Sequence, residues 1–143
     1  MTPYHCNEAI LQLRNVRTMV DLTRQLLGIV TEDGVELELV IVRTPATAGQ
    51  SLKVAVDEGV AERKRSLRGF EVVSSTERDY PALIGMEVRV THVDSRRGPR
   101  FTHEFHCVIG GLRTGFHCTC RLADAPACDE WMQLMLEDLA LRD

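Results

Sequence analysis

The sequence predicts an α+β fold, in which a single domain holds one antiparallel β-sheet with two main helices packed on one face. Three observations predict it. Segments with the alternating pattern of strands fill most of the chain, and a tight turn at Gly110-Gly111 joins the two clearest of them. Only the segments 51–67 and 127–141 read clearly as amphipathic helices. With 143 residues the chain is long enough for a real core, so residues 1–143 are interpreted as one domain.

Composition excludes several classes of protein. Hydrophobic residues make up 44% and charged residues 27% of the chain, as in ordinary globular proteins. The net charge of −4 argues against a general nucleic-acid binder. The first residues lack the basic and apolar regions of a signal peptide, and no apolar run approaches the ~20 residues of a membrane span. We therefore expect a cytoplasmic protein that does not insert into membranes and whose cysteines stay reduced.

The N-terminal region is the part that periodicity determines least. Residues 4–13 weakly resemble a strand. Between residues 16 and 27 the apolar side chains fit both a helical stripe and one face of a strand. Both alternatives stay open on this evidence.

A hairpin signal at Asp33-Gly34 begins the clearer part of the chain. Residues 35–42 then alternate between apolar and other side chains, which predicts a strand with one strongly apolar face. Ser51 can cap a helix that Gly69 terminates. The buried stripe expected for this helix consists of Leu52, Ala55, Val56, Gly59, Val60, Arg63 and Leu67.

Two more strands and a closing helix are expected. Residues 70–75 and 83–91 are strand-like, and Tyr80-Pro81 marks the bend between them. Asp124 and Pro126 mark the start of the helix at 127–141. Its expected buried stripe consists of Cys128, Trp131, Met132, Met135 and Leu139.

The hairpin at residues 101–120 is the most specific structural prediction. If Gly110-Gly111 forms a two-residue turn, Phe105 lies opposite Phe116. One face of the hairpin then carries Phe101, His103, Phe105, Cys107, Ile109, Leu112, Phe116, Cys118 and Cys120. The other face is more polar and leaves room for solvent or a partner.

Histidines and cysteines gather in this hairpin and suggest zinc. The ones on the apolar face are His103, Cys107, Cys118 and Cys120. His106 and His117 point to the opposite face, so the candidate ligands diverge. The C-x-C spacing also lacks the C-x2-C form of a zinc knuckle. We expect a packed core and no metal site.

Catalytic signatures are missing from the sequence. It contains no Gly-x-Ser-x-Gly turn and no glycine-rich phosphate loop. Glu104 opposite His117 is a candidate acid/base pair, but a cross-strand polar pair is the commoner explanation. We expect a protein that is not an enzyme, with no catalytic residue and no cofactor.

The segments Met1–Ala9, Asp21–Leu26 and Leu39–Arg43 resemble the first three strands of the Eag-type adaptor chaperones of type VI secretion. Ser66–Val72 is similar to the link after the central helix of this family, and the hairpin and closing helix complete the order of elements. The family has the DcrB-like, PsbP-related fold. The resemblance implies that Val20–Leu27 is a strand.

The resemblance also implies a function. Such chaperones are cytoplasmic homodimers that bind the N-terminal transmembrane helices of secreted effectors, often with PAAR and Rhs regions, and shield them before export. The residues assigned to the client-binding face are Leu22, Arg24, Leu26, Glu104 and His117. The alternative is another non-enzymatic binding protein with a DcrB/PsbP-like fold, such as an immunity protein that neutralises a toxin.

Overall fold

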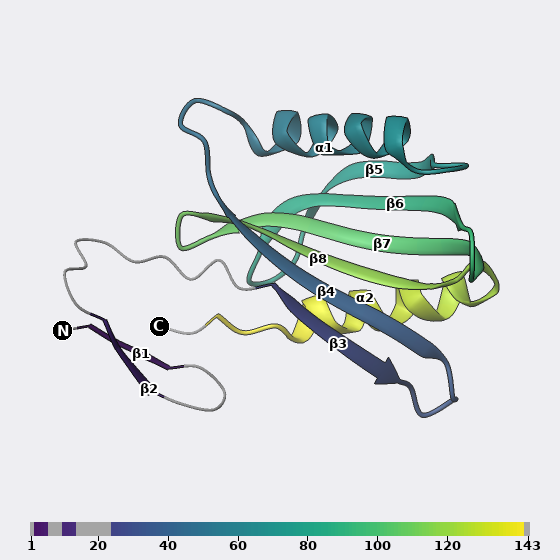
Figure 1. Cartoon of the computed structure of the whole chain (residues 1–143), viewed down its shortest axis with the longest axis horizontal. Coiled ribbons are helices and arrows are strands. Elements are labelled where there is room, and N and C mark those ends of the chain that lie inside the picture. The colour runs from purple at the N-terminus through teal and green to yellow at the C-terminus, as the bar shows by residue number, and fades with distance from the viewer. Residues whose placement is uncertain (1, 6–9, 14–23, 142–143) are drawn as a thin grey trace.

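The computed structural model describes residues 2–5, 10–13 and 24–141 of the chain. Its main part is a six-stranded antiparallel sheet with the strand order β3-β4-β8-β7-β6-β5 (Figure 1). A separate two-stranded antiparallel sheet contains β1 and β2. The strands are β1 (Thr2–His5), β2 (Ile10–Leu13), β3 (Gln25–Val30), β4 (Glu36–Pro45), β5 (Glu71–Asp79), β6 (Ile84–Asp94), β7 (Gly98–Ile109) and β8 (Leu112–Arg121). The helices are α1 (Leu52–Ser66), the 3-10 turn η1 (Leu122–Asp124) and α2 (Ala125–Asp138).

The β7–β8 hairpin has the predicted register. Phe105 lies opposite Phe116, and the other predicted pairs are also formed. Gly110 and Gly111 have φ angles of 57° and 79°, in the region that side-chain-bearing residues rarely adopt. Both central positions of this two-residue turn therefore favour glycine, which is why the turn could fix the register from sequence.

The edge strand β3 includes the last residues of segment 16–27, for which periodicity left helix and strand open. It forms a hairpin with β4 through a turn in which the Thr31 amide donates to the Val35 carbonyl at 2.9 Å. The strand alternative is confirmed for Gln25–Leu27, and β3 continues to Val30. Residues 14–23 lie outside the described part of the chain. Residues 4–13, expected as one weak strand, contribute instead to both β1 and β2.

Helix α1 begins and ends close to the predicted residues. The Ser51 hydroxyl accepts a hydrogen bond from the Val54 amide at 3.2 Å, as expected of an N-cap. Within the predicted stripe, Ala55 and Val56 are buried. Val56 packs with Phe70 and with the apolar side chains of β6.

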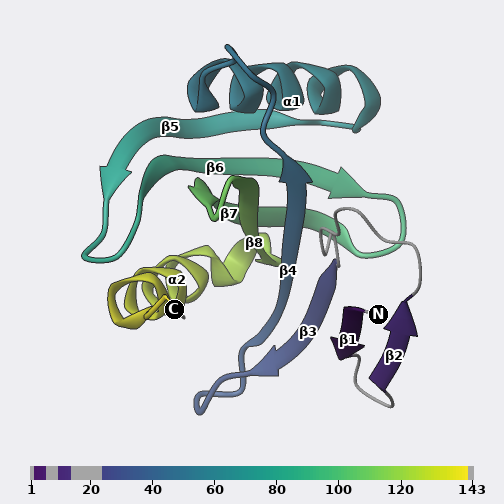
Figure 2. The same cartoon turned by 90° about the vertical axis from the view of Figure 1, so that its left-hand side faces the viewer.

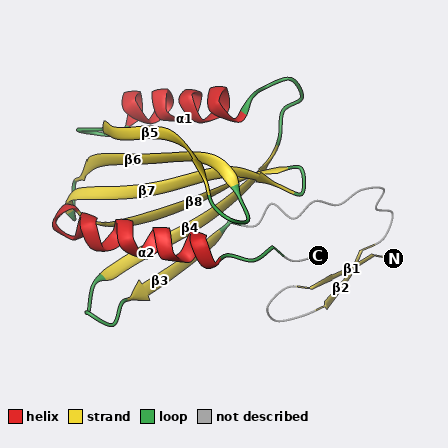
Figure 3. Ribbon diagram, turned by 180° about the vertical axis from the view of Figure 1, so that it is seen from behind, coloured by secondary structure: helices red, strands yellow, loops and turns green. Residues whose placement is uncertain are grey.

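The two helices lie on opposite faces of the sheet, so the prediction that both pack on one face was wrong (Figures 2 and 3). His103 and Glu104 are consecutive on β7 and point to opposite sides. His103 contacts Asp129 of α2, with 2.7 Å between Nδ1 and Oδ1. Glu104 contacts Arg63 of α1. An amphipathic stripe shows that a helix is buried, but it does not show against which face.

The hydrophobic core is correspondingly divided between the two faces. The cluster on the α2 side contains the apolar face of the hairpin together with Leu37 and Leu39 of β4. The buried members that α2 contributes are Cys128, Met132 and Leu136, of which the predicted stripe had the first two. The predicted core set of His103, Cys107, Cys118 and Cys120 is buried, which confirms that part of the prediction. Neither of the described helices is long and apolar enough to cross a membrane.

Candidate functional site

A polar cluster lies on the α1 side of the sheet, in the middle of β7. Its centre is Glu104, whose side chain is fully buried. The guanidinium of Arg63 on α1 donates hydrogen bonds to both carboxylate oxygens, with 2.9 Å between Nη2 and Oε1. This paired, charge-assisted arrangement offsets the cost of burying the carboxylate.

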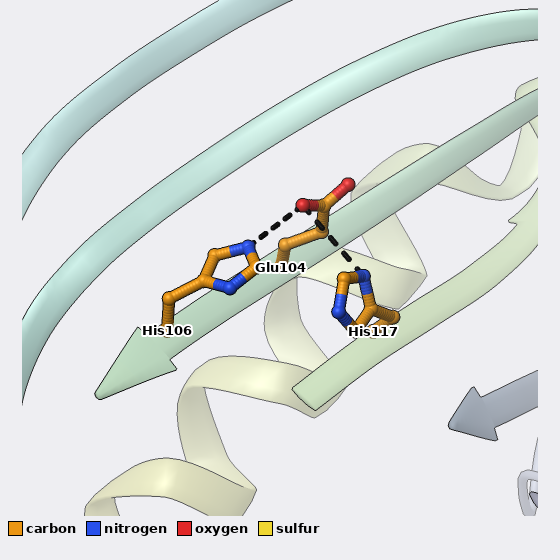
Figure 4. A group of neighbouring side chains, drawn as sticks. All are labelled: Glu104, His106 and His117. Carbon is orange, nitrogen blue, oxygen red and sulfur yellow. Dashed lines mark hydrogen bonds and ion pairs between the residues drawn. The ribbon is translucent and has the colours of Figure 1, made fainter. Parts of the chain in front are cut away.

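Two histidines complete the cluster (Figure 4). His106 follows on the same face of β7, and its Nε2 lies 2.8 Å from Glu104 Oε1. His117 lies directly opposite Glu104 on β8, and its Nδ1 is 3.6 Å from the same oxygen. The two imidazole rings meet edge to face with their centroids 5.0 Å apart. One carboxylate oxygen therefore orients both rings.

Electrostatics fix the charge state of this cluster. Burial raises the pKa of Glu104, but hydrogen bonds from His106 and Arg63 and the nearby imidazole of His117 outweigh it and hold the pKa well below its usual value. Burial lowers the pKa of His106, and the hydrogen bond to Glu104 offsets only part of that effect. Glu104 is therefore ionised at neutral pH, and a carboxylate with so low a pKa is a weak general base.

The same three residues carry atoms of the kind that bind metals. One ligand atom each from Glu104, His106 and His117 lies within 4.8 Å of the others. Arg63, however, occupies both oxygens of Glu104, and its positive charge opposes a cation at this place. The arrangement favours a hydrogen-bonding cluster over a metal centre.

Gly115 on β8 provides the space for both imidazoles. A Cβ atom at this position would lie 2.7 Å from His117 Nε2 and 3.3 Å from His106 Nδ1. The first distance is too short for a real contact, so a side chain here would displace His117. The cluster therefore depends on a glycine that the sequence analysis did not single out.

A cavity of about 360 Å³ opens beside the cluster, between α1 and the sheet. Apolar residues of α1 form one wall together with Glu62 and Arg63, and a Cβ atom on Gly59 would meet nothing within 4 Å. The sheet forms the other wall, with side chains from β4, β7 and β8. The main lining residues are Val42, Ala55, Val56, Gly59, Arg63, His106, Arg113 and His117.

Three of the five predicted client-face residues share one row across the sheet. Leu26 of β3 lies opposite Val40 of β4, and Val40 lies opposite His117 of β8. His117 in turn lies opposite Glu104. Directly opposite residues of antiparallel strands point to the same face, so the apolar edge and the polar cluster belong to one surface. Leu26 is 62% exposed, whereas Glu104 is covered by Arg63.

The other predicted residues have different outcomes. Arg24 is exposed and directly precedes β3. Leu22 lies outside the described residues. The sequence analysis missed the role of Arg63, although the predicted stripe of α1 contains it. A charged residue within a buried stripe is the signal that an oppositely charged partner is buried opposite it.

A second cavity, of about 620 Å³, lies on the same surface beyond the row. It is lined by the exposed side of β3, from Leu26 to Val30, and by the arginines Arg97, Arg100 and Arg121. We call the surface formed by both cavities and the row between them the open face. It consists of the parts of β3, β4, β7 and β8 on the α1 side, together with the side of α1 that lines the first cavity.

The sequence analysis also missed a polar network under α2. His103 lies between Asp129 and Glu87, with 3.2 Å between its Nε2 and Glu87 Oε2. Arg89 donates to Asp129 at 3.0 Å, and the Tyr80 hydroxyl donates to Glu87. Because His103 and Glu87 are almost fully buried, this network is interpreted as a structural link between α2 and the sheet.

Solved structures show which fold this is. No protein-family model and no curated protein matches the chain by sequence. The protein PA94 from Pseudomonas aeruginosa, a candidate regulator of unknown function, is similar with a TM-score of 0.77 and 15% identity over 100% of this chain and 98% of its own. LpqN of Mycobacterium tuberculosis, which is involved in cell envelope biogenesis, has a TM-score of 0.60 and 12% identity over 96% of this chain and 87% of its own.

The cyanobacterial PsbP protein CyanoP from Synechocystis is a third neighbour. Its TM-score is 0.52 with 12% identity, and the match covers 78% of each chain. At such low identity the three neighbours establish the fold alone. The chain has a PsbP-like α+β fold, which confirms the PsbP-related part of the predicted resemblance.

Proposed function

We propose that this protein is an adaptor chaperone of type VI secretion, which binds and shields the N-terminal transmembrane helices of a PAAR/Rhs-type effector before export. The observation that carries the proposal is the open face. It joins the exposed apolar side chains of Leu26 and Val30 to the polar cluster around Glu104. A transmembrane helix in water exposes apolar surface worth about 25 cal/mol per Å², and this surface needs cover until export.

The length of the open face suits a membrane-spanning helix. Arg113 and Arg121 are eight residues apart on β8, and at ~3.4 Å per residue the strand between them measures about 27 Å. A helix of that length has about 18 residues at 1.5 Å per residue. A membrane span needs about 20 residues. One client helix can therefore lie along β8.

The mixed chemistry of the open face supports the same occupant. Transmembrane helices carry small and polar side chains where they pack against each other. His106 and His117 line the cavity beside α1 and offer hydrogen-bonding groups to such residues. Gly59 leaves space on α1 for a close approach. An entirely apolar groove would not favour a transmembrane helix over other apolar segments.

We infer binding rather than catalysis. In the cluster on the open face, Arg63 engages both oxygens of Glu104, so the carboxylate is committed to a structural pair. The PsbP-like fold agrees with the resemblance of the sequence to the Eag-type chaperones, and the proposal places the protein in the cytoplasm, without a cofactor and without nucleic acid as a partner.

A second copy of the chain is the further partner that we propose. Strand β3 lies at an edge of the six-stranded sheet and carries no charged residue. Its side chains Leu26, Leu27 and Val30 are 62%, 48% and 69% exposed. An uncharged apolar edge strand favours pairing with another chain. A homodimer would cover this edge and enclose more of the client.

Co-expression tests the proposal. The N-terminal region of the effector encoded beside this protein is expressed with and without the chain, and its soluble fraction and co-purification are measured. We expect the region to stay soluble and to co-purify only when the chain is present. A matched client from which the apolar segments are deleted should not bind. Binding of the deleted client would contradict the chaperone proposal and favour an adaptor or immunity protein that recognises a folded polar surface.

A further inference from the structure

Three arginines gather at one end of the open face. Arg100 on β7 lies directly opposite Arg121 on β8, and Arg97 lies in the turn before β7. All three line the cavity of about 620 Å³, where they meet the exposed apolar side chains of β3. We call these three residues the arginine cluster.

The described residues neutralise the arginine cluster only in part. Like charges directly opposite each other on neighbouring strands are destabilising. Arg97 has an ion pair with Glu38 at 3.2 Å and Arg121 has one with Asp124 at 3.1 Å, and both arginine side chains are largely exposed. Such exposed pairs contribute little. For Arg100 no ion pair is formed with any carboxylate in the described part of the chain.

A histidine continues the row across the strands, although burial lowers the pKa of His92, so it adds no positive charge at neutral pH. His92 on β6 lies opposite Arg100, so a histidine and two arginines follow each other across three strands. The acidic residues that line the same cavity are Glu36 and Glu38, and Glu38 is already paired. Because the whole chain has a net charge of −4, this positive end is a local feature and not part of a general basic surface.

We propose that the arginine cluster binds an acidic segment of the client next to the helix that lies on the open face. This proposal rests on the proposed function, because it takes the client helix as given and names the chemistry of its flank. Guanidinium groups bind carboxylates through paired hydrogen bonds. The C-terminus of a helix carries a partial negative charge, so the C-terminus of the client helix is also favoured beside the arginine cluster. The cluster therefore sets the direction in which the client helix lies.

Charge reversal tests this proposal. The double variant Arg97→Glu/Arg121→Glu changes two largely exposed side chains, so it should keep the fold. Thermal unfolding of the variant checks this. Binding of the effector's N-terminal region should weaken about ten-fold at low salt, and the difference from wild type should shrink at high salt. Arg96→Glu is the matched control. Arg96 lies in the same turn and is exposed, but it does not line the cavity.

A client variant provides the reciprocal test. If the acidic residues beside the client helix are changed to lysine, binding to the wild-type chain should weaken, and the double variant should recover it. Equal binding by wild type, the double variant and Arg96→Glu would overturn the arginine-cluster proposal. Binding to vesicles that contain phosphatidylserine is measured for the same proteins. If the double variant loses vesicle binding but still binds the client like the wild-type chain, the proposal is also overturned, because the cluster would then bind anionic lipid.

The two proposals fail in different ways. If deletion of the client's apolar segments abolishes binding but charge reversal has no effect, the chaperone proposal stands and the arginine cluster has no role in it. If charge reversal abolishes binding but the apolar deletion does not, the chaperone proposal fails, and with it the assignment of an acidic flank beside a bound helix.

Discussion

The guanidinium of Arg63 on α1 donates hydrogen bonds to both carboxylate oxygens of Glu104 on β7, across 41 positions of the chain. This ion pair joins the helix to the middle of the sheet. The same carboxylate also contacts His106 and His117 and orients both imidazole rings. The polar part of the open face therefore depends on a contact between two residues that have no local relationship.

Arg63→Ala should destabilise the fold because it leaves the fully buried Glu104 without its cation. Removing one partner of a buried ion pair costs about 3–5 kcal/mol. Because the Arg63 side chain is 29% exposed and solvent screens its charge, we expect a smaller cost of about 2–3 kcal/mol. Urea unfolding measures it. Arg65→Ala, on the exposed side of the same helix, is the control and should change the free energy of unfolding by less than about 0.5 kcal/mol.

Gly115→Ala should disturb the histidines without affecting the rest of the sheet. The new Cβ would lie 2.7 Å from His117 Nε2, so the imidazole must move. We expect a loss of about 1–2 kcal/mol, typical of mild overpacking. In a His117→Ala background the same change should cost less than about 0.5 kcal/mol, because the clash is gone. An equal cost in both backgrounds would mean that the clash is not with His117.

Gly59→Ala is the matched control for the glycine change. Its Cβ would meet nothing within 4 Å, so the helix should gain up to about 1 kcal/mol from the better helix former. The added methyl group would also project into the cavity beside α1. A weaker client interaction in this stabilised variant would support the open face as the binding surface.

Phe116→Ala should be strongly destabilising because its side chain packs opposite Phe105 in the core under α2. The expected cost is about 3–5 kcal/mol, the usual range for a buried aromatic side chain. Chemical denaturation measures it, with Val108→Ala as the exposed control on the same hairpin. A loss below about 1 kcal/mol would show that this face is not the core.

Acid should weaken the network under α2. Burial raises the pKa of Glu87, but hydrogen bonds from His103 and Tyr80 and the charge of Arg89 outweigh it, and its pKa is lowered to about 2. A carboxyl whose pKa is lower in the folded state stabilises the fold above its unfolded pKa, and this contribution is lost as the pH falls. The loss should begin near pH 4.5, the ordinary value, and be complete near pH 2.

The size of this effect follows from the shift. Between those two pH values Glu87 should contribute up to about 3 kcal/mol to the pH dependence of unfolding. Urea unfolding at a series of pH values measures the slope. The Glu87→Gln variant should have a shallower slope below pH 4.5 than the wild-type chain. Equal slopes for both proteins would show that Glu87 does not contribute to the pH dependence of the free energy of unfolding.

Local signals in the sequence predicted the local structure well. The Gly110-Gly111 turn allows few alternatives, so it fixed the register of β7 and β8 and the content of each face. Ser51 fixed the start of α1 in the same way. The pairing of Glu104 with His117 followed from this alternation, whereas the assignment of Leu26 to the same face came from the resemblance to a known family.

Contacts between distant segments were not predictable from the same signals. The apolar stripe of a helix does not indicate against which face of a sheet the helix packs. Both helices were therefore assigned to the wrong arrangement, with one face covered by both. The partner of Arg63 is 41 residues away, and the network of Glu87 and His103 forms only when β6, β7 and α2 meet. Glu104 was therefore expected on an open surface, although the structure covers it with α1.

Two apolar-to-charge variants at opposite edges of the sheet test most directly whether the open face holds the client. Leu26 on β3 is 62% exposed on the open face, and Val73 on β5 is 61% exposed away from it. Co-purification of the effector's N-terminal region with Leu26→Asp should fall at least about ten-fold, because an unpaired charge would face the apolar client helix. Val73→Asp should bind like the wild-type chain, and thermal unfolding confirms that both variants fold. Full client binding by a folded Leu26→Asp variant would contradict the claim that the open face holds the client.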